Sequence, residues 1–195
     1  MSDDDVVRSN HLMDIAARQH GEGVTPKLFE PIQLGGLTLS NRIVIAPMCQ
    51  YSGVDGQMTD WHLIHLGHLA LSGAAALTIE ATAVEPEGRI TYADTGLWND
   101  ATEAAMARTI ESIRRWSDIP LVIQLAHAGR KASTDVPWEG GEQFPPGHKH
   151  GWQTVAPSPI PFESGEHPPR ALDRTALEHI RESFAASARR AARLG

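Results

Sequence analysis

Three short apolar runs, each followed by an amphipathic stretch, constrain the fold of this chain more than any other feature. The runs are residues 43–46, 77–84 and 121–126. They are apolar along most of their length instead of alternating with polar residues, which is typical of parallel strands that helices cover on both sides. Such alternation of strand and helix predicts right-handed βαβ crossovers and a parallel sheet.

The three predicted helices begin at residues that commonly cap helices. The first is expected over about residues 60–72, with Thr59 as N-cap and Gly73 as the stop. The second follows Asp100, whose spacing from Glu103 is that of a capping box. The third follows Asp173, and its apolar residues recur every three or four positions: Leu177, Ile180, Phe184, Ala188 and Ala191.

The segment before the first strand predicts a short β-hairpin. Gly35 and Gly36 separate two apolar runs within residues 32–39, which is a hairpin turn signal. Residues 1–26 start with an acidic stretch and end at a proline, and we expect them to form a flexible N-terminal extension. Residues 27–195 are long enough to form one domain with a sizeable core.

Composition narrows the classes of function. The formal net charge of -7 disfavours nucleic-acid and anionic-membrane partners, because both need clustered cations. No run approaches the roughly 18 apolar residues of a membrane span, and the acidic N-terminus is unlike a secretory signal. Cys49 is the single cysteine, so an internal disulfide and a cysteine-rich zinc site are excluded. We expect a cytoplasmic protein.

Two architectures fit the strand–helix pattern: an open doubly wound sheet and a closed (β/α)8 barrel. A barrel typically needs about 250 residues, and three units are too few to close one. The glycine-rich phosphate motifs of dinucleotide and P-loop folds are absent, as is the G-x-S-x-G elbow of hydrolases. The loop over residues 128–170 is a candidate lid or substrate-facing segment, because long loops in compact domains are usually functional or disordered.

In either architecture, ligands bind at the carboxyl ends of the parallel strands. Three clusters of unusual residues lie there: residues 46–51, residues 80–83 and residues 124–130. Gln124 places a polar amide within an apolar strand, where it needs a partner. Their convergence at one edge predicts a binding site.

Each of these residues also has a purely structural explanation. A lone Cys49 is usually a small core residue, and Tyr51 in an ordinary loop would simply pack. His62, His65 and His68 are three apart, but steps of three drift around a helix. Because no H-E-x-x-H motif accompanies them, packing or surface roles are favoured and no metal site is predicted.

The ordered set of short motifs resembles the Old Yellow Enzyme family of NADH:flavin oxidoreductases, most closely its bacterial xenobiotic-reductase-like branch. The resemblance extends over residues 28–195. The segments that carry it read LFEP at 28–31, LSNRI at 39–43, PMCQY at 47–51, EATAV at 80–84, PEGRI at 86–90, QLAHAGRK at 124–131 and APS at 156–158.

The resemblance implies the N-terminal part of a (β/α)8 barrel, with about three βα units preceded by the hairpin. It implies FMN as cofactor, NADPH or NADH as reductant, and enones or other activated alkenes as substrates. Gln124 would read the uracil-like edge of the flavin with its donor and acceptor. Residues whose backbone would line the isoalloxazine ring are Ala46, Pro47, Met48, Cys49 and Ala81. Cys49 would also tune flavin reduction, and Tyr51 would donate a hydrogen bond to a substrate carbonyl.

In the family, a histidine-containing segment, a tyrosine proton donor and the phosphate loops come later in the sequence. We therefore expect this chain to be a truncated ene-reductase that binds flavin weakly on its own, with a homo-oligomer as the assembly of the full-length protein. An alternative is a non-catalytic half-barrel that pairs with a second copy or a complementary half. A metal-dependent barrel enzyme that uses His127 and the loop histidines is disfavoured.

Overall fold

The computed structural model describes residues 25–195, which divide after Arg42 into two compact units. The predicted extension lies almost wholly outside the described residues. In the first unit a 3-10 helix, η1 (Lys27–Phe29), precedes strands β1 (Ile32–Leu34) and β2 (Leu37–Leu39). The two strands pair antiparallel, and Gly35 takes a φ of 57° in the turn between them. The predicted hairpin is confirmed.

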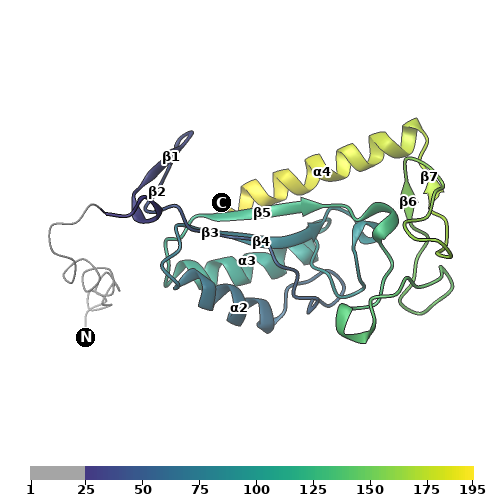
Figure 1. The fold of residues 1–195 in the computed structure, drawn as a ribbon, viewed down its shortest axis with the longest axis horizontal. Helices are drawn as coiled ribbons and strands as arrows, with labels where there is room; N and C mark the ends of the chain where they lie inside the picture. Colours follow the sequence, from purple (N-terminus) through teal and green to yellow (C-terminus); the bar gives the residue numbers. More distant parts are fainter. Residues whose placement is uncertain (1–24) are drawn as a thin grey trace. The chain divides into compact units, whose positions relative to one another are not determined.

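The second unit is built on a three-stranded parallel sheet in the order β3-β4-β5 (Figure 1). Its strands are β3 (Val44–Ile45), β4 (Ala76–Ala83) and β5 (Leu121–Ala126). β4 pairs with a parallel neighbour on each side. The parallel sheet is as predicted, with β5 at its predicted bounds and β3 shorter than expected.

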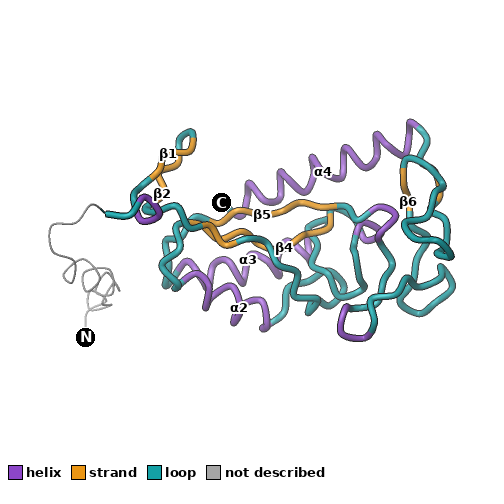
Figure 2. The backbone as a smooth tube through the Cα atoms, in the orientation of Figure 1, coloured by secondary structure: helices purple, strands orange, loops and turns teal. Residues whose placement is uncertain are grey.

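Three helices pack against this sheet (Figure 2). They are α2 (Asp60–Ala70), α3 (Asp100–Arg114) and α4 (Arg174–Leu194), so α2 ends two residues before its predicted end. Burial of apolar side chains between sheet and helices drives this packing. The buried residues of this core are Met58, Leu66, Ala70, Leu77, Ile79, Leu97, Met106, Ile110 and Ile113.

The N-terminus of α3 differs from the prediction. Asn99 is the N-cap, and its side chain accepts a hydrogen bond of 2.9 Å from the backbone N–H of Thr102. Thr102 completes the capping box, since its hydroxyl oxygen accepts from the Asn99 N–H at 3.2 Å. The predicted box of Asp100 and Glu103 was wrong because both side chains instead form ion pairs with Arg190.

Among the described residues, helices cover only one face of the sheet. The helix-covered face carries Leu77 and Ile79, whereas Val44 and Val122 on the opposite face remain 50% and 46% exposed. The prediction of helices on both faces was therefore wrong for residues 25–195. The apolar pattern has another cause in a barrel, where the inner face is filled by side chains from other strands and needs no helix.

The long loop after β5 contains regular structure of its own. It holds the 3-10 helices η3 (Gly129–Lys131) and η4 (Pro137–Glu139), and then β6 (Val155–Ala156). β6 pairs in parallel with β7 (Arg170–Ala171), directly before α4. No helix within residues 25–195 combines the length and apolarity needed to cross a membrane.

Replacing Asn99 by alanine is expected to lower the free energy of unfolding by about 1 kcal/mol, because the Thr102 N–H loses its acceptor. Urea denaturation followed by circular dichroism measures the loss. Asp100→Ala is the matched control, since that carboxylate is 96% exposed and contributes only a surface ion pair. An equal loss of stability in both variants would instead support the capping box of Asp100 and Glu103 that was predicted from the sequence.

Candidate functional site

The three sequence clusters meet at the carboxyl-terminal edge of the parallel sheet. β3 leads directly into residues 46–51, and the register of β4 with β5 places Ala81 opposite Gln124. Between Ile79 and Ala81 the register shifts, so Glu80 has no partner on β5 and forms a bulge. The predicted convergence of the clusters is confirmed by this topology.

Cys49 lies at the centre of the convergence and is partly buried. The Ala81 backbone and the Tyr51 hydroxyl lie close enough to its thiol to affect the pKa. The structure thus brings together three of the predicted site residues from two strand ends.

The surroundings of Cys49 keep it a neutral thiol. Burial raises the pKa of this thiol, and the negative charges of Asp94 and Glu80 raise it further. The hydrogen bonds from Ala81 and Tyr51 oppose the shift with a smaller effect. Cys49 is therefore protonated at neutral pH, unlike a reactive cysteine, whose thiolate is stabilised by cations.

The backbone of Tyr51, which carries the phenol into the site, has an unusual conformation. Its φ of 47° lies in the left-handed region, which residues other than glycine rarely adopt and which costs about 1–2 kcal/mol. Burial, followed by the charges of Cys49 and Asp94, raises the pKa of Tyr51 to about 12. The phenol therefore stays protonated at physiological pH and can donate a hydrogen bond.

Trp138 reaches this site from the long loop. Its ring, on η4, meets Tyr51 edge-on with a centroid distance of 6.0 Å and an interplanar angle of 66°. The Trp138 side chain is 64% exposed. The loop was predicted as a candidate substrate-facing segment, but Trp138 itself was missed. The available signal was a large aromatic residue directly after Pro137 in a polar loop.

The remaining predicted residues are accessible. Ala46 and Gln124 are exposed, Pro47 is partly buried, and Met48 is 67% exposed. Gln124 shares the uncovered face of β5 with Val122, so solvent can satisfy the amide that the sequence analysis expected to need a partner. This face therefore offers an apolar surface with one amide group.

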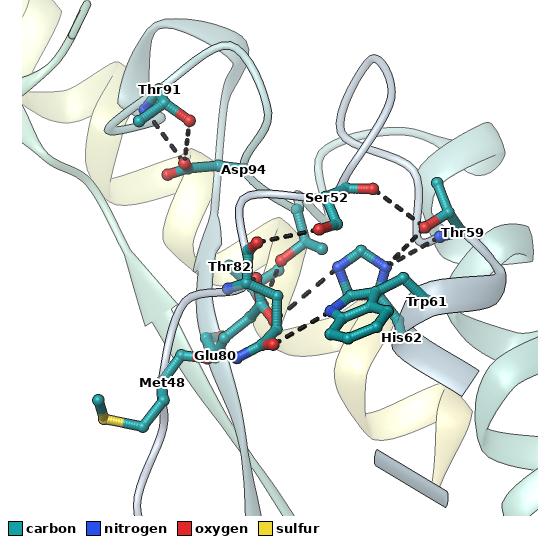
Figure 3. Close-up of polar contacts among 11 residues, drawn as sticks. Met48, Ser52, Thr59, Trp61, His62, Glu80, Thr82, Thr91 and Asp94 are labelled. Atoms are coloured by element: carbon teal, nitrogen blue, oxygen red, sulfur yellow. Dashed lines mark hydrogen bonds and ion pairs between the residues drawn. The ribbon is translucent and has the colours of Figure 1, made fainter. Parts of the chain in front are cut away.

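Two further polar residues, which the sequence analysis did not assign to the site, lie beneath residues 48–51 (Figure 3). Glu80 is 2% exposed, and its Oε1 accepts the backbone N–H of Gln50 at 3.1 Å. Its Oε2 lies 3.8 Å from Nε2 of His62, which is fully buried. His62 Nδ1 accepts the Thr59 N–H at 3.0 Å. Of the two roles predicted for these histidines, packing or surface, burial gives His62 the packing one. Nowhere in residues 25–195 do three or more His, Cys, Asp or Glu side chains gather as metal ligands.

At the other end of the segment, the backbone of Gly53 lies close against residues 93–94. The Gly53 N–H donates to the Ala93 carbonyl at 2.8 Å, and a Cβ at Gly53 would lie 2.8 Å from the Asp94 carbonyl oxygen. Only glycine allows this approach. The Asp94 carboxylate accepts bonds from the Ile90 N–H at 2.7 Å and the Thr91 hydroxyl at 2.8 Å, while burial raises its pKa.

Curated relatives match this chain over most of its length. NADH:flavin oxidoreductase FG08077 of Gibberella zeae is 42% identical over 172 residues, which is 87% of this chain and 41% of the relative. The NADPH dehydrogenase of Bacillus cytotoxicus is 37% identical over 171 residues, or 87% of this chain and 44% of the relative. The chain therefore spans less than half the length of these two relatives.

Solved structures show the same fold. Morphinone reductase in complex with tetrahydroNAD matches with a TM-score of 0.70 and 30% identity, over 88% of this chain and 47% of that one. Old Yellow Enzyme from Pichia sp. matches with a TM-score of 0.68 and 22% identity, over 85% of this chain and 42% of that one, which supports the fold alone. The sheet and its helices are thus the N-terminal part of a (β/α)8 barrel.

The family model that matches describes the NADH:flavin oxidoreductase / NADH oxidase family, and it covers residues 27–195. The match begins at the first 3-10 helix and includes every strand and helix of the described structure. FMN is the cofactor of this family, and NADH or NADPH is its reductant. The chain belongs to the NADH:flavin oxidoreductase / NADH oxidase family of oxidoreductases.

Proposed function

We propose that this chain forms one wall of the FMN site of an NAD(P)H-driven ene-reductase, which reduces activated carbon–carbon double bonds such as those of enones. The observation that carries the proposal is the meeting of Cys49, Tyr51 and Ala81 at the carboxyl edge of the sheet. In (β/α)8 barrels the active site is at this edge. Names of relatives support the redox chemistry, since they include NADPH dehydrogenases.

The residues of this wall fit a flavin ring. An isoalloxazine is flat and mostly apolar, and the exposed side chains of Ala46 and Met48 lie at the carboxyl edge, where β3 ends. Its uracil-like edge alternates donors and acceptors, and the exposed amide of Gln124 offers one of each. In the proposed site, backbone groups of residues 46–49 and Ala81 border the ring.

When bound, FMN would take electrons from NADH or NADPH and supply the hydride for the substrate. The Tyr51 hydroxyl would turn from Cys49 to the substrate carbonyl and donate its one hydrogen bond there, and its pKa of about 12 keeps the proton available for this purpose. Cys49, a neutral thiol with a raised pKa, would tune flavin reduction without adding a charge. Trp138 would border the substrate beside Tyr51.

Loops that follow strands seven and eight commonly hold the phosphate in barrels, whereas the principal sheet of the described residues has three strands. We propose a cytoplasmic location, a homo-oligomeric full-length enzyme and no nucleic-acid partner, in keeping with one cysteine and a net charge of -7.

The uncovered sheet face also favours the second candidate, a half-barrel assembly module, because exposed apolar surface often marks an interaction site. Val44 and Val122 would then contact a protein partner. Light scattering together with flavin absorbance separates the two functions. A dimer without flavin supports the module, whereas a flavin-bound species supports the enzyme.

The 195-residue chain is expected to bind FMN and riboflavin with similar, weak affinity, because its wall contacts the ring and not the phosphate. Quenching of flavin fluorescence during titration measures both affinities. Gln124→Leu should weaken both, while Gln33→Leu in the hairpin serves as the matched control. If the chain bound FMN tightly and stoichiometrically but riboflavin weakly, the prediction that it contacts the ring and not the phosphate would be wrong.

Tyr51→Phe is expected to lower kcat for an enone by about a hundredfold in the FMN-loaded enzyme, because one donor to the carbonyl is lost. Steady-state assays with NADPH and NADH measure the effect. Tyr92, the other tyrosine, stacks on His150 with a centroid distance of 4.2 Å, so Tyr92→Phe is the control. Equal rates for Tyr51→Phe and the parent would remove Tyr51 from the mechanism.

Cys49→Ala is expected to shift the midpoint potential of bound flavin, because a polarisable thiol is removed from the ring's surroundings. Spectroelectrochemical titration measures the potential, and stopped-flow reduction by NADPH measures the accompanying rate. Cys49→Ser, which keeps a hydrogen-bonding group, should shift the potential less. If both variants retain the parent potential and rate, Cys49 has no part in flavin reduction.

A further inference from the structure

Two buried polar atoms beneath the Met48–Tyr51 segment face each other without a hydrogen-bond partner. They are His62 Nε2 and Glu80 Oε2, which lie 3.8 Å apart (Figure 3). Their side chains are 0% and 2% exposed. Buried polar groups without partners destabilise a fold, and neither atom belongs to the proposed contacts with flavin or substrate. Their presence therefore needs an explanation.

The hydrogen bonds of His62 determine its tautomer. Nδ1 accepts the backbone N–H of Thr59, so Nδ1 carries no proton and Nε2 does. The Nε2–H group thus faces the carboxylate of Glu80. At 3.8 Å the contact is too long for a hydrogen bond, and an approach of about 0.8 Å would make one of ordinary length. Hydrogen bonds in unliganded sites are often long and tighten with ligand.

Glu80 connects this histidine to the proposed flavin wall. The bulge between Ile79 and Ala81 frees Glu80 from the β4–β5 ladder, and its Oε1 accepts the Gln50 N–H. Gln50 stands between Cys49 and Tyr51 in the sequence. Because Tyr51 has a φ of 47°, contacts outside the segment must hold its backbone in place. The Glu80–Gln50 bond is such a contact.

We propose that the buried His62–Glu80 pair is a positioning device, which holds the Gln50 amide and thereby fixes where Cys49 and Tyr51 meet flavin and substrate. The role of the segment rests on the proposed function. The pair acts on the peptide backbone and touches neither the cofactor nor the substrate.

Two substitutions of His62 separate this role from simple helix capping. His62→Gln places an amide N–H near the former Nε2 and loses the acceptor of the Thr59 N–H. His62→Asn keeps an acceptor for Thr59 at the former Nδ1 but falls short of Glu80. Residue-resolved hydrogen exchange of the Gln50 amide, measured by NMR on the 195-residue chain, reports the contact directly.

We expect the Gln50 amide to exchange roughly five- to tenfold faster in His62→Asn, because Glu80 loses the Nε2–H group that faces its second oxygen and holds its first oxygen on Gln50 less firmly. His62→Gln should exchange at the parent rate. Core amides such as that of Leu77 should be unaffected in both, because a general loss of stability would accelerate them together. The reverse order, with His62→Gln faster at Gln50, would make His62 a helix cap and overturn the proposal.

Glu80→Gln supplies a second test that preserves side-chain shape in case a His62 variant does not fold. Cys49 is the only cysteine, so the pH dependence of alkylation reports its thiol alone. Burial influences its pKa most, followed by the charges of Asp94 and Glu80, and Ala81 and Tyr51 oppose them. Removing the Glu80 charge should lower the pKa of the thiol and speed alkylation near neutral pH. An unchanged titration together with Gln50 exchange at the parent rate would overturn the proposal.

Glu85→Gln is the matched control. Glu85 follows β4 and also meets a histidine, His127, at 2.9 Å, but it has no bond to Gln50. Its replacement should leave Cys49 alkylation and Gln50 exchange as in the parent. Neither measurement needs bound flavin. If Glu80→Gln alters Cys49 alkylation, Glu85→Gln does not, and FMN fails to bind, only the proposed function fails. If FMN binds but neither Cys49 alkylation nor Gln50 exchange changes in the test variants, only the positioning role fails.

Discussion

The parallel pairing of β4 with a neighbour on each side is the interaction on which the rest of the structure depends. It brings the ends of three strands to one edge and directs the helix-covered face, with Leu77 and Ile79, into a continuous core. The register shift after Ile79 then frees Glu80 from the ladder to serve the neighbouring segment. One strand therefore supplies both the centre of the core and the support of the site.

A nearly buried carboxylate is expensive to keep in a protein, because its charge loses hydration. Glu80 keeps this position although its Oε2 has no hydrogen-bond partner. Its charge also raises the pKa of the Cys49 thiol, together with burial and Asp94. A site that uses a neutral thiol and a protonated phenol benefits from such surroundings, whereas a nucleophilic cysteine would need cations there. Buried groups that destabilise the fold, as this carboxylate does, are expected at functional sites.

Sequence patterns predicted the parts of the molecule that local rules govern. The strands, the hairpin at Gly35 and the N-cap at Thr59 follow from apolar runs and turn chemistry. The role of Glu80 could not be predicted, because it depends on a bulge that exists only once β4 pairs with β5. For the same reason the cap of α3 was misplaced: tertiary ion pairs with Arg190 engage Asp100 and Glu103, and Asn99 takes their expected role.

The two faces of the sheet have different roles. The helix-covered face buries its apolar residues and stabilises the fold, which restricts what substitutions it tolerates. The uncovered face leaves Val44 and Val122 about half exposed and presents the Gln124 amide between strand ends. Both faces read as apolar in the sequence, so periodicity alone assigned them the same covering. What distinguishes them is the Gln124 amide, which lies opposite Ala81 near the carboxyl end of the strands. Side chains of other strands fill the rest of this face in a barrel, whereas a ligand at the carboxyl end can reach the amide.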